Sequence, residues 1–217
     1  MTTMCRLLLA AAAVFLLLPF SGQGQDTVAT GARSSIGFRA GYGIPLGEWA
    51  KSRIAPEVQM FSGGVSVEGD ISFRLGQKWA LAVGGSYTKL SGSNWEEHTK
   101  SYGDVVGVNA SIATVSISFR PHLMTSSNNL LFFELGVTGI FASGDEVVNG
   151  EHYAYDFFSD FRFGGQAALE YDRLVSDDIA FTLRAGAVVG PNAMSYADGE
   201  SRTIIYVPLM AGIRFLL

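Results

Sequence analysis

The sequence predicts an all-β protein, an eight-stranded antiparallel up-and-down transmembrane β-barrel. Strict alternation of apolar and polar residues is the first observation that predicts it. Between Gly63 and Leu75, one parity carries Val65, Val67 and Ile71, while the other carries serine, acidic and arginine side chains. A period of two indicates a β-strand with two chemically different faces. The spacing of the connections and the placement of the charges are the other two observations.

Eight segments show this alternation. The fourth changes parity near Ala113 and Thr114, which predicts a β-bulge. The fifth is less regular, because Phe132 and Ile140 interrupt its polar face. In chain order, the expected strands are 35–43, 63–75, 79–88, 104–120, 131–141, 160–171, 179–187 and 206–215.

The connections between these strands alternate in length. Four are long and polar, namely 44–62, 91–101, 143–155 and 190–202. Three are shorter, namely 76–78, 121–129 and 172–178. Short turns at one end and long loops at the other are typical of up-and-down barrels in the bacterial outer membrane.

Alternation alone does not say which face points outward, and a soluble lipocalin-like barrel would place its apolar face inside. Side-chain composition favours the opposite arrangement. The polar face of the third strand consists of alanine, glycine, serine and threonine, whereas soluble surfaces are rich in lysine and glutamate. No lysine lies near the middle of any expected strand. The polar face is therefore expected to line a narrow lumen.

Charges near the middle of the strands are expected to pair inside that lumen, since a buried charge needs a partner. They include both signs in equal number, and the small residues around them leave room for long side chains. The expected lumen network comprises Arg39, Glu68, Asp70, Arg74, Glu134, Asp160, Arg162, Glu170, Arg184 and Arg214. A structural network is favoured over a proton relay, because eight-stranded barrels are filled by side chains.

Aromatic residues on the apolar face gather near both ends of the strands. Such girdles suit the two membrane–water interfaces, where amphipathic rings are enriched. Near the short turns lie Phe73, Trp79, Phe119, Tyr171, Phe181 and Phe215, and towards the long loops lie Tyr42, Tyr87, Phe141 and Phe161.

The amino terminus has the features of a cleaved signal peptide, with Arg6 before an apolar core at 7–18 and a small-x-small site at 22–24. Twelve apolar residues are too few to span a bilayer as a helix. The expected organisation is therefore a signal peptide at 1–24 followed by one barrel domain at 25–217. The only cysteine, Cys5, lies in the removed segment, so the mature chain has no thiol.

Several functional classes find no support in the sequence. The formal net charge of −5 and the absence of a basic stripe argue against a nucleic-acid partner. His98, His122 and His152 all fall in expected loops or turns, which does not suit strand-borne catalysis. Acidic residues near His98 and His152 match no metal-binding spacing. We therefore expect no catalytic residues, no cofactor and no metal site.

The chain resembles the small eight-stranded outer-membrane β-barrel family, the OmpX/OmpA-type barrel domain. The signal peptide, the eight alternating strands and the ending Gly212-Ile-Arg-Phe-Leu-Leu217 carry this resemblance. Gly212, Phe215 and Leu217 match the family's carboxy-terminal assembly signal, although the family usually ends on an aromatic residue. The resemblance implies residence in the outer membrane of a Gram-negative bacterium. The implied partners are membrane lipids, lipopolysaccharide and the outer-membrane assembly machinery.

Two functional hypotheses follow from different classes. The first is a structural or surface-interaction protein, which presents four extracellular loops, with Trp49 and Trp95 exposed, on a side-chain-filled barrel. The second is a pore for small solutes, which the packed lumen disfavours. A lipid-modifying enzyme ranks third, because no expected strand carries a histidine. Loop sequences contain no readable code for a surface partner.

Overall fold

The computed structural model describes residues 34–51, 61–75, 78–92, 105–126, 128–148, 151–154, 161–195 and 201–217. These residues form nine β-strands and one short 3-10 turn, η1 (Glu48–Ala50). The strands are β1 (Ser34–Leu46), β2 (Phe61–Arg74), β3 (Trp79–Gly92), β4 (Val105–Thr125), β5 (Asn129–Val148), β6 (Glu151–Ala154), β7 (Arg162–Leu174), β8 (Ile179–Ser195) and β9 (Ser201–Leu216). The expected signal peptide, Asp160 and Trp95 lie outside the described residues.

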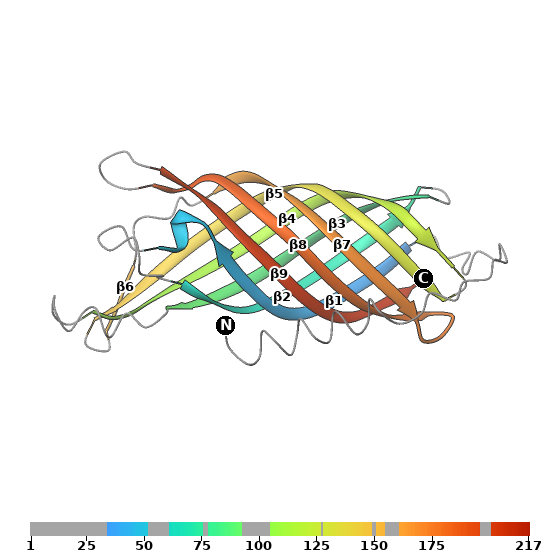
Figure 1. The fold of residues 1–217 in the computed structure, drawn as a ribbon, viewed down its shortest axis with the longest axis horizontal. Helices are drawn as coiled ribbons and strands as arrows, with labels where there is room; N and C mark the ends of the chain where they lie inside the picture. The colour runs from blue at the N-terminus through green and yellow to red at the C-terminus, as the bar shows by residue number, and fades with distance from the viewer. Residues whose placement is uncertain are drawn as a thin grey trace.

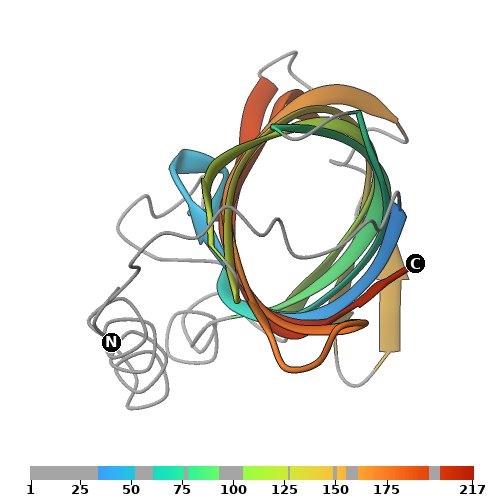
Figure 2. The same ribbon diagram turned by 90° about the vertical axis from the view of Figure 1, so that its right-hand side faces the viewer.

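Eight of the strands close into a barrel, and every neighbouring pair is antiparallel. The order around the wall is β4-β3-β2-β1-β9-β8-β7-β5, and pairing of β4 with β5 completes the ring. Viewed along its axis, the strands form a closed ring (Figure 2). From the side, the strands are strongly tilted, as barrel closure requires (Figure 1). The predicted eight-stranded up-and-down barrel is confirmed.

The ninth strand, β6, does not belong to the wall. It pairs only with the end of β5, from Asp145↔Ala154 to Val148↔Glu151, and forms a hairpin beyond the barrel body (Figure 1). The connection expected at 143–155 is therefore largely a β-ribbon. The expected turn at 121–129 is also shorter than predicted, because β4 continues to Thr125.

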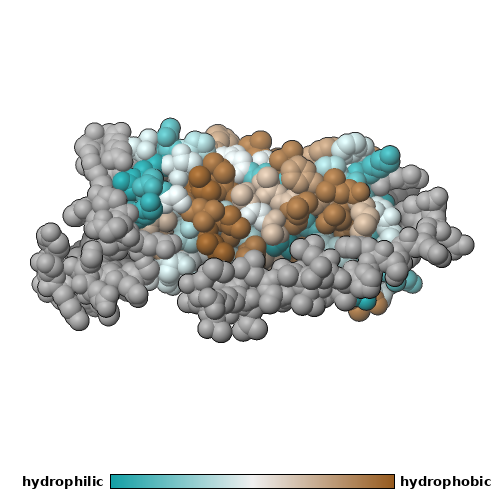
Figure 3. Space-filling view, viewed as in Figure 1, coloured by the Kyte–Doolittle hydropathy of each residue, from teal (hydrophilic) through white to brown (hydrophobic). Residues whose placement is uncertain are grey.

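The two strand faces have the predicted orientation. Outward-facing Val67, Ile71, Val137 and Ile117 expose roughly half of their side chains. Inward-facing Ser66, Asp70 and Ser72 on β2 are buried. On the face shown in Figure 3, apolar side chains gather over the middle of the barrel, with hydrophilic residues towards both ends. A soluble barrel would show the reverse distribution, so the outer wall suits an apolar environment.

The backbones of the first strand, β1, and the last strand, β9, approach each other unusually closely at glycine positions. A Cβ added to Gly212 would lie 1.9 Å from the carbonyl oxygen of Phe38, and one added to Gly41 would lie 1.9 Å from that of Leu209. Real side chains do not tolerate such distances to backbone atoms. Gly212 is paired with Arg39, so this glycine lets the last strand approach the first.

The β-bulge predicted near Ala113 and Thr114 is wrong. Pairing through this point is continuous on both sides, with Tyr87↔Ala113 and Thr114↔Ile140 in register. Register shifts in β4 occur instead at Val105/Gly107 and His122/Met124. The apparent change of parity has another cause. Inward-facing residues of β4 are apolar at Ala110 and Ile112 but polar from Thr114 to Arg120, because the lumen itself changes composition along its length.

Among the described residues, no helix is long and apolar enough to cross a membrane, a result that does not bear on crossing by strands.

Candidate functional site

The half of the lumen nearer the short turns is filled by ion pairs. Arg39 on β1 lies at its centre, with 3% of its surface exposed. It contacts Glu68 at 2.7 Å and Glu170 at 2.8 Å, and it also pairs with Asp70. One guanidinium therefore joins carboxylates from β2 and β7, on different parts of the barrel wall.

Two further arginines link the wall around Glu134 of β5. Arg120 contacts Glu134 at 2.7 Å and Asp70 at 2.8 Å. Arg184 contacts Glu134 at 2.5 Å and Glu68 at 3.3 Å. Gln166 also donates a hydrogen bond to Glu134, at 2.6 Å. Since each carboxylate meets more than one cation, the network offsets much of the desolvation cost of burying its charges.

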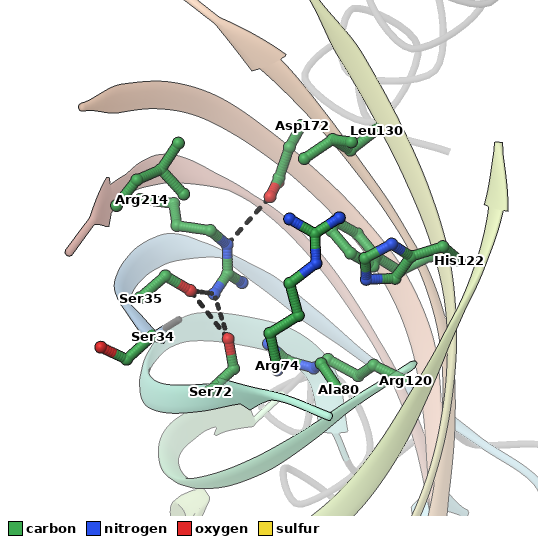
Figure 4. A pocket seen from close by; sticks show the side chains of 12 residues that line it. Ser34, Ser35, Ser72, Arg74, Ala80, Arg120, His122, Leu130, Asp172 and Arg214 are labelled. Carbon is green, nitrogen blue, oxygen red and sulfur yellow. Dashed lines mark hydrogen bonds and ion pairs between the residues drawn. The ribbon is translucent and has the colours of Figure 1, made fainter. Parts of the chain in front are cut away.

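Arg214 of β9 completes the network at the short-turn end. It contacts Asp70 at 3.1 Å and Asp172 at 2.9 Å, and it pairs with Glu170. It also donates a hydrogen bond to the hydroxyl of Ser35, at 2.9 Å. A cavity of about 50 Å³ lies beside this arginine, between Asp172, Arg74 and His122 (Figure 4). A space of this size, lined in part by polar side chains, is large enough to hold water.

The structure brings most of the sequence-predicted lumen residues together. Arg39, Glu68, Asp70, Glu134, Glu170, Arg184 and Arg214 all take part in the ion pairs just described. Arg74 lies nearer the short turns and lines the cavity at the mouth, while Glu68 and Asp70 pair with the other arginines. Asp160 lies outside the described residues.

The placement of Arg162 in the lumen network is wrong. Arg162 is exposed at the start of β7, where it donates hydrogen bonds to the carbonyl oxygens of Asn192 and Phe161. Sequence reasoning missed two members of the network, Arg120 and Asp172, which were assigned to a strand end and a turn. Parity could have identified both, since Arg120 follows Ser116 and Ser118 on the inward face and Asp172 follows Glu170.

The half of the lumen nearer the long connections is filled by apolar side chains instead. None of these is more than 8% exposed, and several are large. The cluster comprises Trp49, Ala50, Phe61, Leu90, Ala110, Ile112, Ile140, Ala142, Val188, Ala193, Met194, Ile204 and Tyr206. Ile140, which interrupts the polar face of the fifth strand in the sequence, is inward-facing and belongs to this apolar layer. Along the barrel axis, the lumen is therefore filled by two successive layers, an ion-pair layer nearer the short turns and an apolar layer nearer the long connections.

Trp49 is the largest member of the apolar layer, and it comes from the first long connection. Its expected exposure is wrong, because the side chain is fully buried. The indole N–H donates a hydrogen bond of 2.8 Å to the carbonyl oxygen of Ile205. The ring packs against Phe61 with a centroid distance of 5.4 Å. Through this side chain, the first connection closes the lumen near its long-connection end.

Polar contacts hold the turn that carries Trp49. The guanidinium of Arg202 donates hydrogen bonds to the carbonyl oxygens of Glu48, at 2.7 Å, and Lys51, at 3.3 Å. Lys51 forms an ion pair of 2.8 Å with Glu48. The hydrogen bond from Lys51, aided by its charge, holds the pKa of the Glu48 carboxyl below its usual value. Gly47 begins the turn at φ 88°, where a side chain would be strained.

A three-stranded sheet continues past the barrel rim at the same end. The outer part of β4 pairs with β5 as far as Val105↔Val148, and β6 pairs with the other edge of β5. Pairing of β3 with β4 ends at Leu90↔Ala110, and pairing of β7 with β5 ends at Arg162↔Ile140. Within the described ranges, no strand covers the outer edge of β6 or the edge of β4 before Ala110.

The histidines do not form a catalytic or metal centre in the described part of the chain. His122 lies at the short-turn mouth, with its ring edge-on to Phe132 at 4.6 Å. His98 falls outside the described residues, and only the backbone of His152 is described, in β6. The described residues contain no group of three or more His, Cys, Asp or Glu side chains that could hold a metal ion.

Aromatic side chains mark both ends of the apolar band. Trp79 and Phe119 stack with centroids 4.9 Å apart near the short turns. The ring of Phe161 lies 4.9 Å from those of both Phe141 and Phe163 towards the long connections. Phe163 exposes 71% of its surface. Two such groups at opposite ends match the arrangement expected at membrane interfaces.

These features define a class of protein, the small outer-membrane-type β-barrel with an apolar exterior and a filled lumen. Comparison with known proteins supports that fold. No protein-family model matches the chain, and no curated protein matches it in sequence. Among solved structures, it is similar to Neisserial surface protein A, with a TM-score of 0.56 and 12% identity, covering 85% of this chain and 97% of that one.

A second solved structure is a major outer membrane protein from Thermus thermophilus. The TM-score is 0.54 at 10% identity, with 87% of this chain and all of that chain covered. At such identities the likeness establishes the shared fold. Both comparisons cover nearly the whole of the known chain, so this protein contains a complete barrel of that kind.

Proposed function

We propose that the protein is an integral outer-membrane barrel whose role is structural or surface-directed, carried out by the β4–β5–β6 sheet and the other long connections. The observation that carries this proposal is the sheet that extends past the rim, with edges that no strand of the described residues covers. Exposed strand edges bind extended segments of other chains through main-chain hydrogen bonds. A rigid barrel would hold these edges at a fixed distance from the bilayer.

The filled lumen supports this proposal over the alternative of a solute pore. Ion pairs occupy one half and an apolar layer closed by Trp49 occupies the other. Conduction would need both layers to rearrange. A lipid-modifying enzyme remains disfavoured. Among the three histidines, only His122 has a side chain within the described part of the structure, and it packs against Phe132 at the short-turn mouth.

Cysteine labelling tests the orientation. The mature chain contains no native cysteine, so single substitutions report without background. Glu151→Cys in the β6 hairpin should react with a membrane-impermeant maleimide on intact cells. Ser176→Cys, in the turn between β7 and β8, should react only after the outer membrane is permeabilised. The reverse pattern would place the projecting sheet in the periplasm and end the surface-directed proposal.

Two measurements on purified protein test the role. In planar bilayers the wild-type barrel should show no steady conductance, and a regular open conductance level would favour the pore.

Peptide binding tests recognition by the strand edge. Immobilised heptapeptides of alternating apolar and polar residues should bind nanodisc-embedded protein through the β6 edge. Tyr153→Pro, which removes a main-chain donor from β6, should weaken that binding, whereas Asp177→Pro in the opposite turn should not. Equal binding by both variants would argue against edge recognition.

A further inference from the structure

The cavity at the short-turn mouth of the lumen is lined largely by groups that carry positive charge or donate hydrogen bonds. Its volume is about 50 Å³, whereas a single water molecule needs roughly 10–15 Å³. Three guanidinium groups line it, those of Arg74, Arg120 and Arg214, together with the hydroxyl groups of Ser35 and Ser72. The cavity therefore has room for a small polyatomic ion, and these groups suit an anion.

Strand position separates these cations from the acids that also contact them. On β2, Asp70 lies further from the turn than Arg74, and on β7, Glu170 lies further from the turn than Asp172. Arg214 contacts Asp70 at 3.1 Å and also pairs with Glu170, so both of these partners lie on its deeper side. Among the described residues that line the cavity, Asp172 is the only acid. The cavity side of the network is therefore richer in cations than in carboxylates.

Asp172 supplies the feature that selects among anions. Its Oδ2 atom contacts Nε of Arg214 at 2.9 Å, and the residue is fully buried. The other oxygen, Oδ1, has no hydrogen-bond partner within the described part of the chain. In Figure 4 the carboxyl points from β7 into the space that Arg74 and Arg214 enter from other strands. A buried acceptor is costly to leave without a donor, so Asp172 favours a ligand that offers a hydroxyl.

One anion meets both requirements. Inorganic phosphate is tetrahedral, carries negative charge and keeps at least one P–OH group at neutral pH. Guanidinium groups bind its ionised oxygens through paired N–H donors. Sulfate has the same shape but no hydroxyl at neutral pH, and chloride has no hydrogen to donate. A phosphate monoester has lost most of its P–OH at neutral pH, because its second pKa is about 6.

We propose that this cavity binds inorganic phosphate, with the ionised oxygens on Arg74 and Arg214 and one P–OH donated to Oδ1 of Asp172. The cavity lies at the barrel mouth, since its lining includes Ser34 and Leu216 at the ends of β1 and β9. In the orientation proposed above, phosphate enters from the periplasm. The ion pairs beyond the cavity block passage, so this is a binding site and not the entrance to a pore. The inference goes beyond the surface-directed role and does not depend on it.

Isothermal titration calorimetry of the mature barrel, refolded in maltoside micelles, tests the site. Titrations with phosphate, sulfate and glycerol 3-phosphate are compared near neutral pH at constant ionic strength. Phosphate should bind saturably at one site. Sulfate should bind about tenfold more weakly, as expected when one hydrogen bond to a charged group is lost. Glycerol 3-phosphate should also bind more weakly than phosphate, because most of it lacks the P–OH group.

Two substitutions separate recognition of the proton from recognition of the charge. Asp172→Asn offers an amide N–H in place of the carboxylate oxygen, so sulfate should bind this variant as tightly as phosphate. Arg74→Gln should weaken binding of both anions by about tenfold, because it removes a charge-assisted contact. The matched control is Arg173→Gln, an exposed arginine at the same end of β7, which should change neither affinity.

Each contrary outcome has a defined meaning. No saturable binding of phosphate would show that the cavity holds water alone and would overturn the site. Equal affinity of the wild-type barrel for sulfate and phosphate would overturn the assignment to phosphate, as would an unchanged preference in Asp172→Asn. Equal weakening by Arg74→Gln and Arg173→Gln would show general attraction by surface charge and overturn the site.

Folding of each variant is checked separately by gel mobility of unheated samples. If Asp172→Asn does not fold, the wild-type comparison of phosphate with sulfate still decides selectivity, and Arg74→Gln still decides location. Surface labelling and peptide binding report the proposed function independently. A folded barrel that binds no phosphate would therefore overturn this inference and leave the proposed function in place.

Discussion

Replacing Arg214 with leucine would remove a cation that contacts three buried carboxylates. Arg214 pairs with Asp70, Glu170 and Asp172, and these carboxylates are themselves at most 5% exposed. Leucine fills part of the same space but supplies no charge. The variant would therefore leave excess negative charge in a region that water enters poorly.

The magnitude follows from the cost of breaking a buried ion pair, about 3–5 kcal/mol when one partner is lost. Loss of the hydrogen bond to Ser35 adds to this, by roughly 1 kcal/mol. A change of this size is a large fraction of a typical domain stability of about 5–15 kcal/mol. We therefore expect Arg214→Leu to fold poorly or to unfold at much lower urea concentration.

Equilibrium urea unfolding in lipid vesicles, followed by tryptophan fluorescence and by gel mobility, provides the measurement. Arg173→Leu, an exposed arginine in the same sheet, serves as control and should change stability by less than about 0.5 kcal/mol. Adding Asp172→Leu to Arg214→Leu should recover part of the loss, because it removes one uncompensated carboxylate. If Arg214→Leu and Arg173→Leu were equally stable, the ion pairs would contribute nothing measurable and the account of the lumen would be refuted.

Three further substitutions test other parts of the structure. Trp49→Ala should cost about 3–5 kcal/mol in the same unfolding assay, because it leaves a cavity in the apolar layer; an unchanged stability would show that the turn does not close the lumen. Val67→Arg should cost roughly 2–4 kcal/mol, since this residue faces outward in the middle of the wall, whereas a soluble barrel would tolerate it. Gly212→Ala should prevent the shift in mobility between unheated and boiled samples, because its Cβ would collide with the carbonyl of Phe38; a normal shift would show that β1 and β9 can separate without loss of closure.

Alternation alone determined much of this protein. A period of two gives each strand its inner and outer face whatever its partners are, so the orientation of Val67 and Asp70 could be derived from residues 63–75. The number of barrel strands and their antiparallel order followed from short and long connections in alternation, whereas β6 was not predicted. Burial of arginines and acids on the polar face followed from the cost of leaving a charge unpaired.

Position along the barrel axis could not be derived in this way. Ala110 and Ile112 face the lumen like Ser116 and Ser118, but parity does not state which inward residues of other strands lie at the same height. The change from an apolar to a polar layer therefore looked like a β-bulge in β4. Tilt and register decide height, and they depend on pairing between strands far apart in the sequence.

Long-range contacts decided the remaining features. Trp49 lies in a connection that reads as polar, and its burial depends on an acceptor at Ile205 and on Phe61. Arg162 has inward parity, yet a carbonyl at Asn192 holds it at the exposed rim. The sequence by itself determined that each barrel strand has one apolar and one polar face, because that alternation is local backbone geometry. The tertiary structure alone decided which residues meet, because barrel closure brings together side chains that the chain order keeps apart.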